Sequence, residues 1–398
     1  PPRSTPLYSS AASDVYKRQV PGSVLVCPQE FKGSLSAYQA CHAISQAVRK
    51  LLPMASVIEQ PMADGGPGTV SIISQSLQGK VIQKQVTGPF GSPRLATYSI
   101  IEKDDSTSIA VIEQASVTAL ADETPNSLDP TVATSYGVGE LILDALGRGI
   151  EEIILGVGGT CTNDGGAGAA QALGLTLLDP AGVELPSHPL HLVRLDQIIP
   201  LSDAGVQSAR LRIAVDVLNQ LLGPTGATTI FGPQKGLKDW QAPALEDSLT
   251  VFADRIHKTF DIDVVNINGT GAGGGLPCGL IAAIPNTTIQ SGAELIADTV
   301  GLSQQITEAD LVITGEGSLD AQTSFGKAVS HVLSIASDAN TPCLGVAGIV
   351  EERPSNMADA EGLVTAHSNS REREAAMAEA SSHTTKATET LLKRYLAL

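Results

Sequence analysis

The sequence has few aromatic residues, a shortage of basic residues and no long apolar run. Its 398 residues include six phenylalanines, six tyrosines and one tryptophan, and 25 lysines and arginines stand against 42 aspartates and glutamates. The net charge of −17 repels nucleic acid and anionic lipid, so we expect no nucleic-acid partner. No apolar run reaches the roughly 18 residues that a membrane-spanning helix needs, so we expect no membrane association.

Cysteines and several catalytic motifs are also scarce. The five cysteines form no CxxC pair, which argues against a disulfide framework or a zinc site and predicts a reducing, cytoplasmic location. The sequence contains no GxxxxGKS/T, GxSxG or HExxH motif. Nothing therefore favours a P-loop nucleotidase, a serine esterase or a zinc protease.

Residues 1–19 differ from the rest of the chain. Ser9–Gln19 reads SSAASDVYKRQ, which lacks the apolar core of a secretion signal. It matches the in-frame translation of a transposase adapter used to prepare sequencing libraries. We interpret these residues as an assembly scar, expect the native first residues to be missing, and leave the segment out of the fold prediction.

The aliphatic residues and 39 glycines favour an α/β fold with parallel strands. Short aliphatic runs predict buried strands at Ser23–Cys27, Ile109–Glu113, Ile153–Val157, Arg212–Val217, Asp310–Thr314 and Cys343–Ala347. Helical spacing predicts helices at Ala37–Leu52, Thr134–Leu146, Gly166–Leu173 and Ala244–Phe260, and a closing helix from Arg371. Ligands of such folds bind beyond the carboxyl ends of the strands, so the loops that follow the strands hold the candidate site residues.

Two of these loops lie near the start of the chain. Lys32 and Ser34 stand between a strand and a helix, which indicates an anion site at the helix N-terminus or an ordinary capped helix with a solvated lysine. Asp64 begins an Asp-Gly-Gly sequence, which is common in turns and can also present a carboxylate.

The loop Gly158–Gly168, with the sequence GGTCTNDGGAG, is the most informative. Glycines such as Gly158, Gly159, Gly165 and Gly166 allow backbone N–H groups to approach an anion. Thr162 and Asn163 could orient oxygens, and Asp164 could bind Mg²⁺ or accept a proton. The alternative is a tight turn whose aspartate caps the next helix.

Two later loops add charge. Lys235 follows a Gly-Pro-Gln sequence, and Gly315-Glu316-Gly317 with Asp320 places two carboxylates after a buried strand, where they could hold Mg²⁺. Gly269–Gly274 fits GxGxxG but has no clear strand before it, so it gives only weak support to a dehydrogenase. Together the loops favour a phosphate-bearing ligand with Mg²⁺, most simply phosphoryl transfer.

These loops contain motifs that resemble those of the type I glycerate kinases. The motifs, in the same order as in that family, are FKGSLSA (31–37), PMADGG (61–66), VTGPFG (86–91), ATSYGVGELI (133–142), GGTCTNDGGAGAAQALG (158–174), FGPQKG (231–236) and VITGEGSLDAQTSFGK (312–327). The resemblance implies ATP-dependent phosphorylation of D-glycerate, with 2-phosphoglycerate as the favoured product. It also implies a flavodoxin-like α/β domain at 20–85 and 285–398, and an inserted α/β domain at 86–284, with the site between them.

We predict a role for each loop residue in that reaction. Asp164 would be the base or would orient the glycerate hydroxyl, with Lys32 and Asp320 as further catalytic residues, and Glu316 and Asp320 would hold Mg²⁺. The predicted substrate-binding residues are Asp64, Ser34, Thr162, Asn163 and Lys235. The predicted ATP-binding residues are Gly158, Gly159, Gly165, Gly166, Gly315 and Gly317.

Three positions depart from the family pattern. Gln29 replaces an aspartate, Pro67 a glutamate and Ser318 an arginine. Loss of these charges could weaken the binding of metal, glycerate or phosphate. Two alternatives therefore remain open: a kinase of another small hydroxy acid, and a weakened relative that binds its ligands without turnover.

Overall fold

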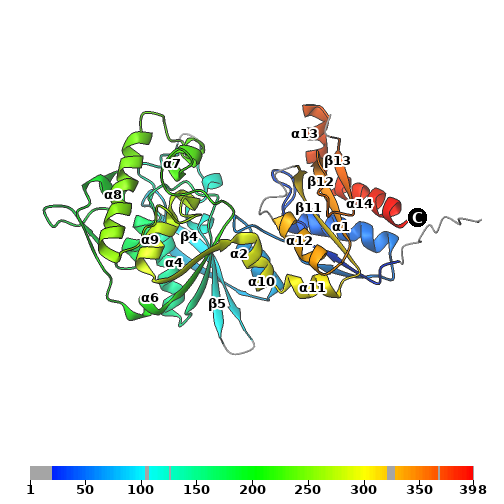
Figure 1. The fold of residues 1–398 in the computed structure, drawn as a ribbon, viewed down its shortest axis with the longest axis horizontal. Helices are drawn as coiled ribbons and strands as arrows, with labels where there is room; N and C mark the ends of the chain where they lie inside the picture. The colour runs from blue at the N-terminus through cyan, green and yellow to red at the C-terminus, as the bar shows by residue number, and fades with distance from the viewer. Residues whose placement is uncertain (1–19, 104–106, 125–126, 321–327, 366–367, 398) are drawn as a thin grey trace, which may run out of the picture.

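The computed structural model describes residues 20–103, 107–124, 127–320, 328–365 and 368–397. The chain forms two lobes (Figure 1), each built around its own β-sheet. The segment that we interpret as an assembly scar, residues 1–19, lies outside the described residues. Among those described, no helix combines the length and hydrophobicity needed to cross a membrane.

The first lobe contains a five-stranded sheet in the order β13-β12-β11-β1-β2, and its neighbouring strands are all parallel. Numbered along this lobe, the order is 2-1-3-4-5, which defines the flavodoxin-like arrangement. The strands are β1 (Ser23–Val26), β2 (Ser56–Glu59), β11 (Leu311–Leu319), β12 (Cys343–Val350) and β13 (Asp359–Val364). The helices are α1 (Ala37–Leu51), α11 (Leu302–Glu308), α12 (Ala328–Asp338), α13 (Ser370–Ala378) and α14 (Ala380–Leu396). The predicted α/β fold from both chain ends is confirmed.

The second lobe contains a six-stranded sheet in the order β10-β9-β6-β5-β4-β3. The strands are β3 (Lys80–Thr87), β4 (Pro93–Glu102), β5 (Ser108–Glu113), β6 (Glu152–Gly156), β9 (Arg210–Val215) and β10 (Asn286–Ser291), and a separate hairpin pairs β7 (Thr176–Leu178) with β8 (Gln197–Ile199). The helices are α2 (Thr69–Ser76), α3 (Ala115–Thr118), α4 (Tyr136–Gly147), α5 (Ala167–Ala172), α6 (Ala204–Ser208), α7 (Ala227–Phe231), α8 (Ala242–Phe260), α9 (Leu276–Ala283) and α10 (Gly292–Thr299). Strands β3, β4 and β5 are antiparallel, whereas β5, β6, β9 and β10 are parallel.

The strand pairing bears on the predicted domain ranges. The prediction gave residues 20–85 and 285–398 to the first domain, but β3 pairs with β4 and β10 pairs with β9, so both belong to the second sheet. These two strands lie at the edges of that sheet, where exposed polar side chains hide the aliphatic signal of a buried strand. The division into domains itself stays a prediction.

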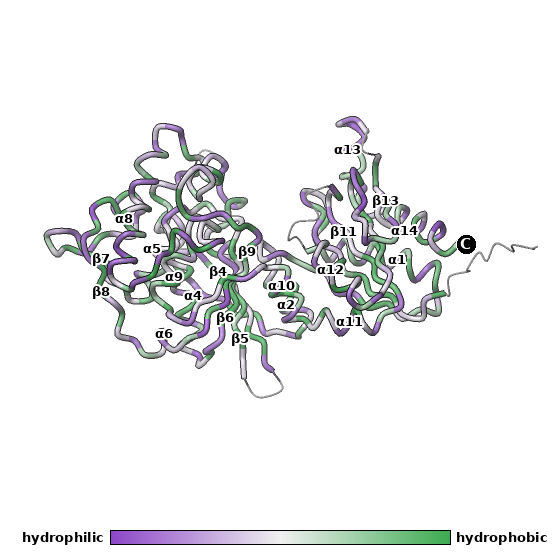
Figure 2. Tube along the Cα trace, viewed as in Figure 1, coloured by the Kyte–Doolittle hydropathy of each residue, from purple (hydrophilic) through white to green (hydrophobic). Residues whose placement is uncertain are grey.

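The core is divided among three clusters of apolar side chains. One lies between α1, α14 and the first sheet, one between the two sheets, and one between the second sheet and helices such as α4, α5, α8 and α9. On β5, Ile109 and Val111 face the middle cluster, and Ala110 and Ile112 face the outer one. Figure 2 shows hydrophobic chain where β5 lies and hydrophilic chain at α13. The middle cluster joins the lobes through α2 and α10.

The predicted closing helix is two helices. The backbone of Glu379 leaves the helical region between α13 and α14. The reason is packing: α14 buries seven side chains against the first lobe, whereas α13 buries only Ala376 and extends away from it.

The lobes meet through glycine backbones. A Cβ atom added at Gly292, the first residue of α10, would lie 1.8 Å from the Asp64 carbonyl oxygen. One added at Gly65 would lie 2.8 Å from the carbonyl oxygen of Ala214 in β9, and Gly65 also has a positive φ of 100°. The Asp-Gly-Gly loop therefore lies directly against the second lobe, at a distance that only glycine allows.

This contact gives a first prediction. We expect Gly292→Ala to lower the free energy of unfolding by about 1–3 kcal/mol, because the added methyl group must push the Asp64 backbone away. Urea denaturation followed by circular dichroism measures the change. Gly147→Ala is the matched control: no atom lies within 4 Å of its added Cβ, so the stability should stay the same or rise slightly. Equal stability of both variants would contradict the close contact.

Candidate active site

A cavity of about 450 Å³ opens between the two lobes. On one side, the cavity is lined by residues from the loops that follow β1 and β2, among them Gln29, Glu30, Lys32, Asp64 and Pro67. The second lobe contributes Leu120, Gly158, Gly159, Asp216 and Gln234. The cavity thus lies at the carboxyl ends of parallel strands, as the fold class predicts.

Lys32 reaches the cavity from a tight turn after β1. The turn is closed by backbone hydrogen bonds between Phe31 and Leu35, and the Ser36 side chain caps α1 in a reciprocal capping box with Gln39. Lys32 is at the exposed tip of this turn. The sequence therefore places an exposed cation on a hydrogen-bonded turn beside a helix N-terminus, which suits an anionic ligand.

Asp64 is held in the cavity wall by two donors. The Gln29 amide donates to Oδ2 at 2.5 Å, and the Gly66 N–H donates to Oδ1 at 3.3 Å. Glu30 is a second acidic side chain in this wall: burial raises its pKa, Lys32 acts in the opposite direction, and Asp64 raises the pKa further. The cavity thus combines a lysine with several carboxylates, and the pKa of one of them, Glu30, is raised.

Gly158 and Gly159 form the opposite wall, and a second cavity of about 120 Å³ continues behind them. Lys235 lines this second cavity and donates from Nζ to the Thr162 carbonyl oxygen at 2.7 Å. Burial lowers the pKa of Lys235 to about 8, although Cys161 and Asp164 act in the opposite direction. Asp216 and Gln234 border both cavities.

Asp164, the predicted base, is not among the residues that line either cavity. It is 1 % exposed, and its carboxylate accepts hydrogen bonds from the Ser135 N–H and hydroxyl, both at 2.8 Å, and from the N–H groups of Gly166 and Gly168. Burial raises the pKa of Asp164, and these donors oppose the rise. The contacts favour a structural role, in which Asp164 ties the glycine-rich loop to the start of α4.

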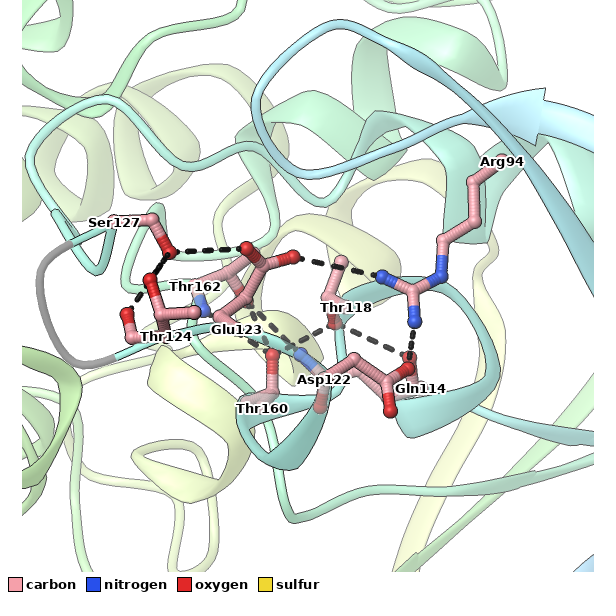
Figure 3. Close-up of polar contacts among 9 residues, drawn as sticks. All are labelled: Arg94, Gln114, Thr118, Asp122, Glu123, Thr124, Ser127, Thr160 and Thr162. Carbon is pink, nitrogen blue, oxygen red and sulfur yellow. Dashed lines mark hydrogen bonds and ion pairs between the residues drawn. The ribbon is translucent and has the colours of Figure 1, made fainter.

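Thr162 and Asn163 are also buried. Figure 3 shows a chain of hydrogen bonds from Thr118 through Thr160 to Thr162 and Gln114. Asn163 donates from Nδ2 to Thr228 at 3.0 Å. The same figure shows Arg94 paired with Asp122 and Glu123. Thr162 and Asn163 therefore hold the loop together and line neither cavity, whereas Thr160 also lines the second cavity.

The other predicted residues divide between packing and a third cavity. Gly165 and Gly166 pack against α8 and α9, and Gly315 packs against the backbone of β12. Ser34 and Gly317 line a cavity of about 270 Å³ in the first lobe. The last part of the 312–327 motif, residues 321–327, lies outside the described residues.

The predicted magnesium ligands, Glu316 and Asp320, stay a prediction. Glu316 lies within β11 and Asp320 directly follows that strand, so their Cα atoms are about 13 Å apart at the usual rise of an extended chain. Because direct Mg²⁺ ligands lie about 2.1 Å from the ion, both side chains would have to extend fully toward each other to share one ion. Among the residues that the structure describes, no group of three or more His, Cys, Asp and Glu side chains could hold a metal.

Sequence reasoning missed Asp216 and Gln234. The predicted strand Arg212–Val217 included Asp216, but β9 ends at Val215, so Asp216 begins the loop beyond the strand. An aspartate directly after an aliphatic run was the signal that could have found it. Gln234 precedes the predicted Lys235 by one residue, and its neutral side chain gave no signal of its own.

The fold and cavity define a class: a two-lobed α/β protein whose ligand site combines lysines, carboxylates and glycine backbone, as small-molecule phosphotransferases require. The chain belongs to the glycerate kinase family, which it matches over residues 24–396.

Similar proteins agree with this assignment. The chain is 38% identical to a glycerate kinase of Halalkalibacterium halodurans over 82% of this chain and 85% of that protein. It is also 38% identical to the glycerate 2-kinase of Escherichia coli, over 86% of this chain and 88% of that protein. A crystal structure from Salmonella typhimurium LT2, provisionally described as glycerate kinase 2, superposes with a TM-score of 0.81 at 35% identity and covers 94% of this chain and 99% of its own.

The contacts of Asp164 give a second prediction. We expect Asp164→Asn to lower the free energy of unfolding by about 1–3 kcal/mol, because an amide cannot accept hydrogen bonds from all the donors that surround the carboxylate. Urea denaturation and the turnover number of the folded variant are measured together. A variant as stable as the wild type that loses turnover by about 10²-fold or more would instead support the base role first predicted.

The buried lysine gives a third prediction. The pKa of Lys235 is lowered from 10.5 to about 8, so the folded protein bears the cost of a buried charge below pH 8. This cost disappears as the pH rises from about 8 to 10.5, and the contribution of Lys235 to stability rises across that window. The affinity for anionic ligands should fall over the same range because the cation is lost.

Calorimetric titrations of ATP and D-glycerate between pH 6.5 and 9.5 would measure this loss of affinity. Lys235→Met should bind at least one of the two ligands more weakly and should lack the fall in affinity above about pH 8. An identical pH dependence in the wild type and the variant would show that Lys235 meets neither ligand.

Proposed function

We propose that this protein transfers the γ-phosphoryl group of ATP to the 2-hydroxyl group of D-glycerate. The observation that carries the proposal is the cavity between the lobes, which brings together Lys32, Asp64, Gly159 and Asp216 from distant parts of the chain. Family membership supports the reaction, and similarity to a protein named glycerate 2-kinase supports the position of transfer.

The two lysines supply the positive charge that the acidic surface lacks. Lys32, at the tip of its turn, would meet the transferred phosphate or the glycerate carboxylate, and Lys235 would meet the other anionic group from the adjoining cavity. The backbone at Gly158 and Gly159 would lie close to the phosphates. Positioning and charge neutralisation account for most of the catalysis in phosphoryl transfer.

We assign the proton acceptor to Asp216. The 2-hydroxyl oxygen forms a bond to the γ-phosphorus, its proton passes to the Asp216 carboxylate, and the bond from the γ-phosphorus to the bridging oxygen of ADP breaks. Asp216 suits this role because its carboxylate stands directly after β9, where it borders both cavities.

The proposal has two further parts. Magnesium stays a prediction from the carboxylates of the loops, and Glu316 and Asp320 are not proposed as joint ligands. A cytoplasmic location is supported by five cysteines that are free and buried, as reducing conditions would leave them.

A second candidate is a weakened relative that binds its ligands without turnover. The amide of Gln29 favours this candidate, because it donates a hydrogen bond to an Asp64 oxygen. The aspartate of the family pattern cannot donate in its charged form, so it would leave that oxygen to a ligand. Pro67, another departure from the family pattern, packs against Gly159 in the cavity wall. A kinase of another small hydroxy acid would keep the same framework and differ in the side chains that line the cavity.

Product analysis tests the proposal. With ATP, Mg²⁺ and D-glycerate, we expect release of ADP and a single new ester, 2-phosphoglycerate, resolved from 3-phosphoglycerate by ³¹P NMR. Calorimetry alongside the assay separates the candidates. Binding of both ligands without ADP release would favour the weakened relative. Turnover only with another hydroxy acid would favour a kinase of that acid.

Asp216→Asn is the matched inactive variant. It keeps the shape of the side chain but not its proton affinity, so we expect kcat to fall by about 10²–10⁴-fold with little change in KM. Asp239→Asn, an exposed aspartate close to Lys235 in sequence, should leave kcat unchanged. Normal turnover of the Asp216 variant would reject the assignment of the base.

A further inference from the structure

The first lobe has its own cavity, separate from the one between the lobes. It has a volume of about 270 Å³ and lies where β12 and β13 end, beneath α13. Its apolar wall is formed by Phe31, Ile349, Leu363, Val364, Ala376 and Met377. The mechanism proposed above uses none of these side chains.

The two cavities share one wall. Lys32 lines both of them, because the turn between Phe31 and Leu35 stands between the inter-lobe cavity and α13. A Cβ added at Gly33 would lie 3.1 Å from the Met377 Cε, so the turn and α13 are in contact. A ligand with an apolar head and an anionic tail could therefore occupy the cavity of the first lobe and extend past Lys32 into the cavity between the lobes.

We propose that this cavity binds the adenine nucleoside of ATP, with the phosphate chain passing Lys32 toward the inter-lobe cavity. The inference rests on the proposed function and adds the location of the donor's base to it. The cavity lies beyond the carboxyl ends of parallel strands, which is the edge of an open α/β sheet at which ligands bind.

The chemistry of the cavity selects this occupant. A mostly apolar wall of this volume suits an aromatic ring system, and a small hydroxy acid would leave its polar groups without partners there. Arg373 and Ser34 add a few polar atoms at the edge of the cavity, as small-molecule sites usually have. The ammonium group of Lys32, which lines both cavities, complements the charge of the triphosphate that follows the nucleoside.

Filling the cavity tests the proposal. Ala376 is buried in the cavity wall, and Ala376→Phe would place a ring where the base binds. We expect the Kd for ATP to rise by about tenfold or more and the Kd for inorganic tripolyphosphate, which has no base, to stay the same. The KM for D-glycerate should also stay the same.

Two further variants keep the test independent of folding. Ala378→Phe adds the same ring to the exposed side of α13 and should bind ATP as the wild type does. Ile349→Ala removes apolar wall without adding bulk and should weaken ATP binding but not tripolyphosphate binding.

The outcomes separate the two proposals. If the wild type binds neither ATP nor tripolyphosphate, the proposed function fails. If the wild type binds ATP and both cavity variants bind it equally well, only the nucleoside site is overturned. Equal weakening of ATP and tripolyphosphate by Ala376→Phe would also overturn it, because the effect would then come from a displaced Lys32.

Discussion

The contact of the Asp64–Gly65 backbone with the second lobe is the constraint on which the rest of the structure depends. Gly292 and Ala214 meet this loop at distances that exclude a side chain at Gly65 or Gly292. The contact places Asp64 at the cavity and brings α2 and α10 into one apolar layer shared by both sheets. The Asp-Gly-Gly sequence at Asp64 thus forms a turn and also presents a carboxylate to the cavity, the two uses that the sequence suggested. It also joins the lobes.

The electrostatics of the cavity follow from its two lysines. A chain with a net charge of −17 repels anions at long range, so attraction must come from nearby cations in a partly desolvated space. Lys32 is exposed to solvent, whereas Lys235 is buried, and the loss of hydration lowers the pKa of Lys235 to about 8. The molecule thus accepts a destabilising group where a phosphate or carboxylate would neutralise it.

Burial decides which features the sequence could predict. The central strands β1, β6, β9 and β11 are covered on both faces and read as aliphatic runs, but β2, β3, β10 and β13 are partly exposed edge strands with mixed composition and were missed. Lys32, Asp64, Gly158 and Gly159 line the cavity as their places after strands suggested. Thr162, Asn163 and Asp164 do not line the cavity, because their side chains form hydrogen bonds within the protein. The sequence of a glycine-rich loop does not reveal whether its polar residues bind a ligand or stabilise the loop, because only three-dimensional contacts distinguish these two roles.

The order of strands in the first sheet has a consequence for biosynthesis. β1 pairs with β11, and hydrogen bonds at its start join residues 287 positions apart, so this sheet must wait for most of the chain to emerge from the ribosome. The six-stranded sheet uses only strands between β3 and β10 and can form earlier. In the folded chain Asp64 and Gly292 are in contact, so the segment between them spans only a short distance once its own sheet has formed, and the late pairing of β1 with β11 then costs little chain entropy.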